Sequence, residues 1–137
     1  MNNFFINPFT KKLDSIGFSN EIEAFDDTAD EILKTIASIK VLEKQVVEIT
    51  VDILGIQDDG SNRASYKLNA LFYRNESGDI TQEGSTWSIN SIESDATWDA
   101  QLVANIATQS IDIKVKGKAL TDIKWKTVAK YNVIQYP

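Results

Sequence analysis

The stretch VVEITVDIL, residues 46–54, decides the fold, because polar and apolar residues alternate along it. Successive side chains of a β-strand point to opposite faces, so a period of two predicts a strand with one buried side and one solvent-facing side. The apolar face consists of Val47, Ile49, Val51 and Ile53. A half-buried strand of this kind needs a partner strand beside it.

That partner follows directly in ASYKLNALFY, residues 64–73, which places Tyr66, Leu68, Ala70 and Phe72 on one face. Between the two stretches lies DDGSN, residues 58–62, whose Asp, Gly, Ser and Asn residues are typical of turns. These residues also offer oxygen ligands for calcium, but they lack the alternating carboxylates and the distal Glu of an EF-hand loop. We therefore predict an antiparallel hairpin and no metal site.

Further extended stretches follow toward the C-terminus. Residues 80–92 are rich in Ser and Thr and suit an edge strand, and the alternation returns in residues 98–106, 110–116 and 123–133. About six to eight short strands separated by turn residues predict an all-β protein. We expect an antiparallel β-sandwich.

Residues 27–41 fit two structures. Apolar residues recur at helical spacing at Ile32, Leu33, Ile36 and Ile39. The same segment also has the period of two of a strand, with one face made of Leu33, Thr35, Ala37, Ile39 and Val41. Periodicity alone leaves both interpretations open.

Residues 1–26 contain five of the six Phe residues without a regular period. We predict an irregular N-terminal arm here, followed by a β-sandwich domain over residues 27–137. So much aromatic surface is unfavourable in water, so the arm docks either on its own domain or on a partner. The candidate assembly residues are Phe4, Phe5, Ile6, Phe9 and Phe18.

The composition excludes several classes of function. The chain has 137 residues, enough for one domain, and contains no His and no Cys. Zinc sites of Cys and His, catalytic thiols and triads with an imidazole base are therefore excluded. A net charge of −6 argues against binding to nucleic acid or to anionic membranes. The apolar runs are far too short to span a bilayer, and nothing indicates a cofactor.

Charge is distributed unevenly. Residues 21–31 hold six acidic residues and no base, whereas residues 114–130 hold six Lys with Asp122 as the one acidic residue. This asymmetry can align the acidic segment with the basic last strand, within one chain or between copies. Alternatively, the Lys residues form a solvated face that protects an edge strand from aggregation.

The three Trp residues have different surroundings. Trp125 is in phase with Ile123 and Tyr131, so we expect it in the core, together with Trp98. Trp87 lies in a polar stretch and is the candidate for an exposed aromatic residue. It can stack on a sugar ring, or it can pack against the arm or a neighbouring subunit.

Three carboxylates, Glu93, Asp95 and Asp99, lie within seven residues of one another. Two carboxylates about 5 to 10 Å apart form the acid and base of a glycosidase. Turn capping and packing around Trp98 explain the same residues without chemistry, and we prefer that interpretation.

Residues 66–133 resemble a small β-domain that recurs in virion proteins of tailed bacteriophages, in tail fibres, tail-associated proteins and head fibres. The matching features are Tyr66-Lys67-Leu68 with Phe72 and Arg74, TQEGST at 81–86, IESDATWDA at 92–100, Val115-Lys116-Gly117 and Ile123-Lys124-Trp125. The resemblance implies a strand upstream, in residues 32–41, and a domain that begins near Asp27. It also implies self-association, with trimers among the forms.

We therefore expect a non-enzymatic structural component of a tailed-phage virion, made in the bacterial cytoplasm. Its arm would attach it to the capsid, collar or tail, with other virion proteins as partners. The alternative is a receptor- or glycan-binding module of a phage fibre, whose partner is a glycan of the host surface. Neither function needs a cofactor, a metal, nucleic acid or a membrane.

Overall fold

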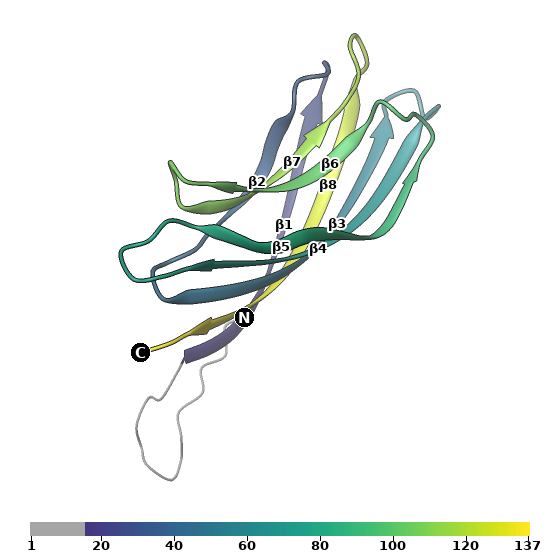
Figure 1. Ribbon diagram of the computed structural model, residues 1–137. Helices are drawn as coiled ribbons and strands as arrows, with labels where there is room; N and C mark the ends of the chain where they lie inside the picture. The colour runs from purple at the N-terminus through teal and green to yellow at the C-terminus, as the bar shows by residue number, and fades with distance from the viewer. Residues whose placement is uncertain (1–15) are drawn as a thin grey trace.

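The computed structural model describes residues 16–137, which form eight β-strands joined by turns and loops (Figure 1). The strands are β1 (Ile16–Thr28), β2 (Lys34–Lys40), β3 (Gln45–Gln57), β4 (Arg63–Arg74), β5 (Thr81–Glu93), β6 (Asp99–Asn105), β7 (Ser110–Lys116) and β8 (Ile123–Gln135). The prediction of an all-β protein is confirmed. No membrane-spanning helix occurs in this part of the chain.

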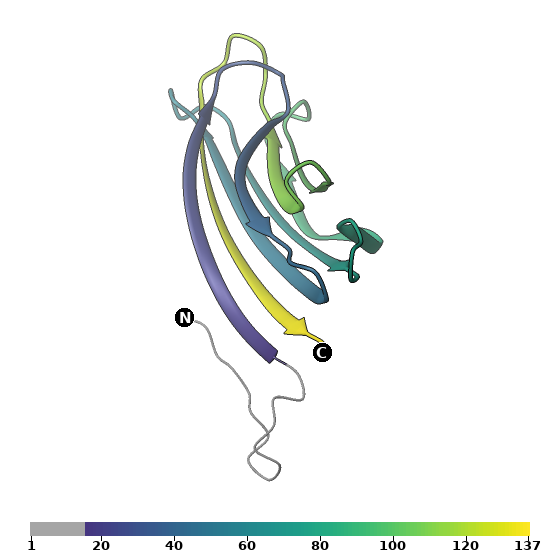
Figure 2. The same cartoon turned by 90° about the vertical axis from the view of Figure 1, so that its left-hand side faces the viewer.

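The strands form two antiparallel sheets. The larger sheet has the order β1-β8-β3-β4-β5 and the smaller one the order β2-β7-β6. Figure 2 shows the long, bent strands of the larger sheet with the smaller sheet lying against one side of it. This arrangement is the predicted antiparallel β-sandwich.

The core lies between the two sheets and follows the alternation seen in the sequence. The inward side chains of β3 are Val47, Ile49, Val51 and Ile53, all buried, and those of β4 are Tyr66, Leu68, Ala70 and Phe72, also buried. The smaller sheet contributes Ile111, Ile113 and Val115 from β7. These three strands therefore face the core with the apolar residues that the period of two selects.

Trp125 connects the core to three parts of the fold. Its ring makes an edge-to-face contact with buried Trp98, with ring centroids 5.6 Å apart. Its Nε1 donates a hydrogen bond to Thr28 Oγ1 at 2.9 Å, at the end of β1. On β3 it faces Gly55, where a Cβ atom would lie 2.5 Å from Trp125 Cζ3. Gly55 is thus required because the indole ring occupies the space of a side chain.

The prediction of an irregular arm over residues 1–26 is wrong for residues 16–26, which form most of β1. This strand pairs with β8 along its whole length, from Ile16 opposite Gln135 to Thr28 opposite Ile123. Two inward positions of β1 are polar, Asn20 and Asp26, and they interrupt the apolar alternation that would have revealed a strand. Residues 1–15, with Phe4, Phe5, Ile6 and Phe9, lie outside the described residues.

The ambiguous residues 27–41 contain a strand, β2, which pairs with β7. A β-bulge between Thr35 and Ala37 shifts the register, so Ile36 and Ile39 both face the core. In a regular strand, residues three apart point to opposite faces. The bulge therefore explains why the apolar residues of this segment recur at helical spacing.

Replacing Gly55 with Ala should destabilise the fold by about 1–3 kcal/mol, because the added methyl group overlaps the Trp125 ring and the core must shift. Chemical denaturation followed by Trp fluorescence measures this change in the free energy of unfolding. Glu83→Ala, at an exposed position on β5, should stay within about 0.5 kcal/mol of the wild type. Equal stability of the Gly55→Ala variant and the wild type would contradict the packing described here.

Candidate functional site

The acidic segment and the basic last strand lie side by side, because β1 pairs with β8. In this register Glu21 lies opposite Lys130 and Asp27 opposite Lys124. The predicted alignment of the two charged segments is confirmed within one chain. The alternative, in which the Lys residues protect an edge strand, is wrong because β8 lies between β1 and β3.

Among the ion pairs between β1 and β8, the one made by Lys126 is the shortest. Its Nζ atom lies 3.6 Å from Glu23 Oε1 and 5.6 Å from the centre of the Phe25 ring. Both charged side chains are about half exposed, so water screens the pair and its contribution to stability is small. The opposite charges therefore favour the pairing of β1 with β8 in this register, but they add little to the stability of the sheet.

Phe18, the one predicted assembly residue that the structure describes, lies on β1 opposite Val133. Its side chain is partly buried and packs against the core of the sandwich. Phe18 therefore contributes to the packing of the domain itself. The four other predicted assembly residues all lie in residues 1–15.

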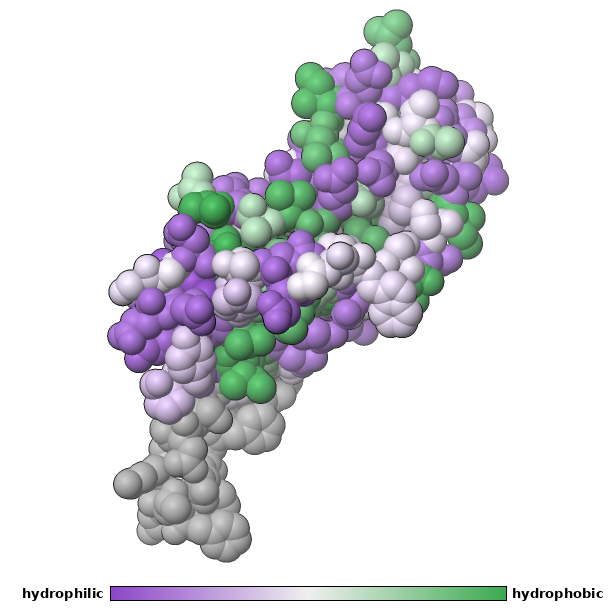
Figure 3. Space-filling view, viewed as in Figure 1, coloured by the Kyte–Doolittle hydropathy of each residue, from purple (hydrophilic) through white to green (hydrophobic). Residues whose placement is uncertain are grey.

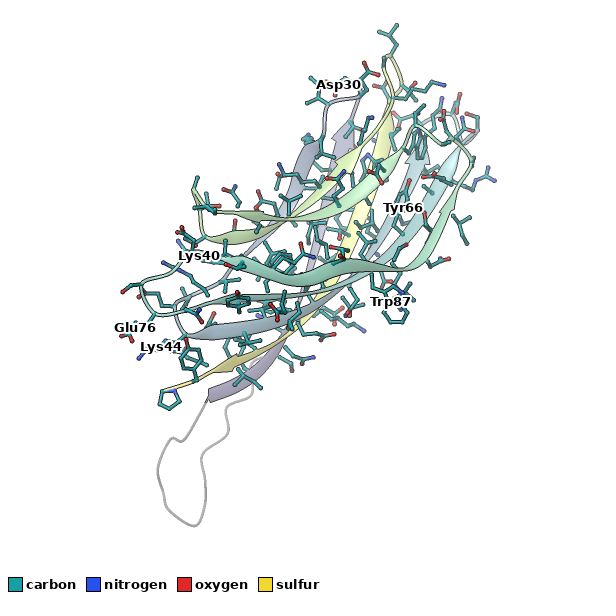
Figure 4. The ribbon with its side chains drawn as sticks, in the orientation of Figure 1. Asp30, Lys40, Lys44, Tyr66, Glu76 and Trp87 are labelled. Carbon is teal, nitrogen blue, oxygen red and sulfur yellow. The ribbon has the colours of Figure 1, made fainter. Side chains whose placement is uncertain are left out.

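Trp87 projects from β5 away from the rest of the sandwich (Figure 4), and 67% of its surface is exposed. It lies opposite Asn69, whose Nδ2 donates hydrogen bonds to Glu48 Oε2 and Thr50 Oγ1. β5 is an edge strand, as predicted for residues 80–92, and its pairing with β4 is interrupted by two register shifts. These irregularities make it harder for another strand to pair with the free backbone edge of β5, whereas the side chains of β5 stay accessible.

The three clustered carboxylates each accept hydrogen bonds that stabilise local structure. Glu93 accepts one from the hydroxyl of buried Tyr66, and burial together with this carboxylate raises the pKa of Tyr66 above its usual value. Asp99 accepts one from the Gln101 side chain at 3.1 Å. Asp95 caps a turn, as described next.

Asp95 accepts hydrogen bonds from the backbone N–H of Thr97 at 3.0 Å, from the Thr97 hydroxyl at 2.7 Å and from Lys118 Nζ at 3.1 Å. These donors lower the pKa of Asp95 to about 2. A glycosidase acid must hold a proton near neutral pH, which requires a raised pKa. Asp95 is therefore unsuited to that role, and its turn-capping contacts agree with the structural interpretation.

A polar groove of about 450 Å³ lies on the outer face of the three-stranded sheet. At its centre is Asp112, which is only 4% exposed. Its carboxylate accepts hydrogen bonds from Ser38 Oγ at 2.8 Å, from Ser110 Oγ at 2.9 Å and from Asn105 Nδ2 at 2.9 Å. Burial by itself raises the pKa of Asp112, but these three donors together lower it below its usual value.

The Asp112 cluster was missed by sequence reasoning. The alternation in residues 110–116 places Asp112 on the polar side of a strand, where exposure is the ordinary expectation. Its partners come from β2, β6 and β7, so no short motif joins them. In the described part of the chain, no three Asp or Glu residues lie close enough together to hold a metal ion.

No family model matches the chain, and no curated protein matches it in sequence. Two solved structures are similar to it in fold. One is the tailspike protein of Acinetobacter baumannii phage AM24, with 7% identity, a TM-score of 0.46 and coverage of 87% of this chain and 26% of that chain.

The other is tailspike protein gp49 of Acinetobacter baumannii bacteriophage Fri1, described as a capsular polysaccharide depolymerase. It has 11% identity, a TM-score of 0.45 and coverage of 98% of this chain and 20% of that chain. The chain thus spans about a quarter or less of these tailspike chains. At TM-scores below 0.5, the two matches assign neither a family nor an activity.

The lowered pKa of Asp112 predicts a loss of stability in acid. Because the pKa is lower in the folded than in the unfolded state, the stabilisation is complete above the ordinary value of 3.8 and is lost as the pH falls through the folded-state pKa. Asp112→Asn should lower the free energy of unfolding at pH 7 by about 1–3 kcal/mol, since the amide cannot accept all three hydrogen bonds.

Urea denaturation between pH 2.5 and pH 7 measures both effects, and the variant should lose less stability than the wild type below pH 4. Asp52→Asn is the matched control, because Asp52 is half exposed and 3.7 Å from its Lys67 partner. An Asp112→Asn variant with the stability and pH dependence of the wild type would overturn this account.

Proposed function

We propose that this protein is a structural component of a tailed-phage virion. The observation that supports this most directly is the ordered run of phage-like motifs in residues 66–133. Most of its large apolar members are buried in the sandwich, among them Tyr66, Leu68, Phe72, Trp98 and Trp125, whereas Ile92 is exposed. The resemblance therefore concerns the residues that build the scaffold, as expected for a protein whose role is assembly.

The proposed attachment element is the arm before β1. Phe4, Phe5, Ile6 and Phe9 precede a sandwich whose core is built from residues of β2, β3, β4, β6, β7, β8 and the connections, with Phe18 and Ile22 of β1 packed against it. Each of these side chains contributes roughly 1.5–3 kcal/mol if a partner buries it fully. We propose that the partners of the arm are proteins of the capsid, collar or tail. We also propose that the chain associates with itself, with trimers among the forms.

We further propose that the chain is not an enzyme. It lacks imidazole and thiol groups, and the turn-capping contacts of Asp95 keep that carboxylate ionised. Glu93 is engaged by Tyr66 and Asp99 by Gln101. These contacts support a structural role for the three carboxylates.

Deleting residues 2–15 should leave the domain folded and lower its incorporation into phage particles at least tenfold. The boundary is set by β1, which begins at Ile16, so a longer deletion would also remove a strand. Circular dichroism checks the fold, and immunoblotting of purified particles measures incorporation. A full-length variant with Ser at positions 4, 5, 6 and 9 is the matched control for chain length and should behave like the deletion. Undiminished incorporation of both variants would refute attachment through the arm.

The second candidate function is recognition of a receptor or glycan on the host surface. The exposed ring of Trp87 favours it, because a free aromatic face on an edge strand is available to stack on a sugar ring. This function requires that Trp87 remain accessible in the assembled particle.

Under the second function, Trp87→Ala should weaken binding to purified host surface polysaccharide at least tenfold, since it removes the stacking surface. Trp87→Tyr should retain most of the binding, and both variants should unfold at the wild-type temperature. Biolayer interferometry with immobilised polysaccharide provides the measurement. The glycan hypothesis is rejected if the wild type does not bind or if Trp87→Ala binds equally well.

A further inference from the structure

Exposed large hydrophobic residues are distributed unequally between the two sheets. Among the described strands, all of them belong to the five-stranded sheet, and β2, β6 and β7 carry none. They are Phe25, Val46, Leu54, Ile56, Leu71, Trp87, Ile89, Ile92 and Ile134. On the side seen in Figure 3, where the three-stranded sheet lies toward the viewer, hydrophobic residues are scattered among hydrophilic ones.

Several of these side chains lie in one row across the outer face of the larger sheet. The register places Phe25, Lys126, Leu54, Ser65 and Ile92 side by side on five successive strands. Phe25, Leu54 and Ile92 are 69%, 57% and 63% exposed. Together with Ile56, the last two line an apolar groove of about 570 Å³.

We propose that the outer face of the five-stranded sheet packs against a second copy of this chain, with Leu54, Ile56 and Ile92 at the centre of the contact. This inference rests on the self-association that the proposed function includes, and it identifies the surface through which the copies would bind one another. Burial of each of these side chains supplies the favourable free energy of association.

The outer face of the five-stranded sheet has enough area to bind a second copy of the chain. Five strands spaced about 4.8 Å apart and up to 13 residues long present an area of roughly 900 Å². A stable interface of standard size buries about 800 Å² on each partner. One sheet face is therefore large enough for a specific contact between two copies.

The charges on this face are compatible with a second copy. Lys126 lies 3.6 Å from Glu23, and Lys67 lies 3.7 Å from Asp52. Because these bases have acidic neighbours on the same sheet, two copies approach without strong repulsion of like charges. The apolar row then contributes the larger part of the contact.

The arm of the same chain is a poorer occupant of the groove. Phe9 precedes Ile16 by seven residues, which span at most about 25 Å. Leu54 lies at the level of Phe25, nine residues or about 30 Å along β1 from Ile16, and two strands away from β1. Phe9 of the same chain therefore cannot reach Leu54, and Phe4, twelve residues before Ile16, reaches it only if the arm extends over about three quarters of its maximal span of about 40 Å.

The test is the mass of the full-length chain in solution, measured by sedimentation equilibrium at protein concentrations up to 100 µM. The wild type should have a mass that is a multiple of 15.3 kDa. Leu54→Glu and Ile92→Glu should each raise the dissociation constant at least tenfold, and the double variant should be a monomer. Both side chains are exposed in the single chain, so the thermal unfolding of the separated variants should resemble that of the controls.

Leu120→Glu and Ile106→Glu are matched controls, because these side chains are exposed but lie in loops outside the sheet, and both variants should keep the wild-type mass. A monomeric wild type, or an unchanged mass of the double variant, would overturn the inference. So would dissociation caused by deleting residues 2–15 alone, which would identify the arm as the contact. If the arm deletion leaves both mass and particle incorporation unchanged while Leu54→Glu dissociates the chain, attachment through the arm fails and this inference stands.

Discussion

The sandwich depends on the position of Trp125 in the middle of the core. This side chain contacts Trp98 in the connection that leads to the smaller sheet, donates a hydrogen bond to Thr28 at the end of β1, and covers Gly55 on β3. Its strand, β8, is also the bridge between β1 and β3. One indole ring therefore links the two layers and the two strands on either side of it, so the relative placement of both sheets depends on its packing.

Carboxylates in this chain act mainly as fixed hydrogen-bond acceptors. Asp112 collects three donors on the outer face of the smaller sheet, and Asp95 holds the turn before β6. A carboxylate satisfied in this way is stabilised in its charged form and rigidifies the elements that donate to it. The polar groups of the domain thus fix its shape, while its exposed apolar side chains remain available for contacts with other molecules.

Much of the fold could be predicted because strands with one buried face leave a period of two in the sequence. β3, β4 and β8 follow this rule closely, and β7 follows it in sequence although Ser110 and Asp112 on its outer face are also buried. β2 was ambiguous because its bulge turns Ile36 and Ile39 to the same side, and β1 was missed because Asn20 and Asp26 occupy inward positions. The unequal distribution of charge did contain a signal for β1, since its acidic residues lie beside the Lys residues of β8. The Asp112 cluster had no such signal, because it is assembled from three strands.

The pairing of β1 with β8 also has a consequence for the order of events during synthesis. β1 is the first described strand to leave the ribosome, and β8 is the last. The edge of β3 that receives β8 stays unpaired until then, and contacts between segments so distant in the chain form slowly. β1 is consequently paired only after the rest of the domain exists. Under the proposed attachment through the arm, particles would then take up finished domains in preference to partly folded chains.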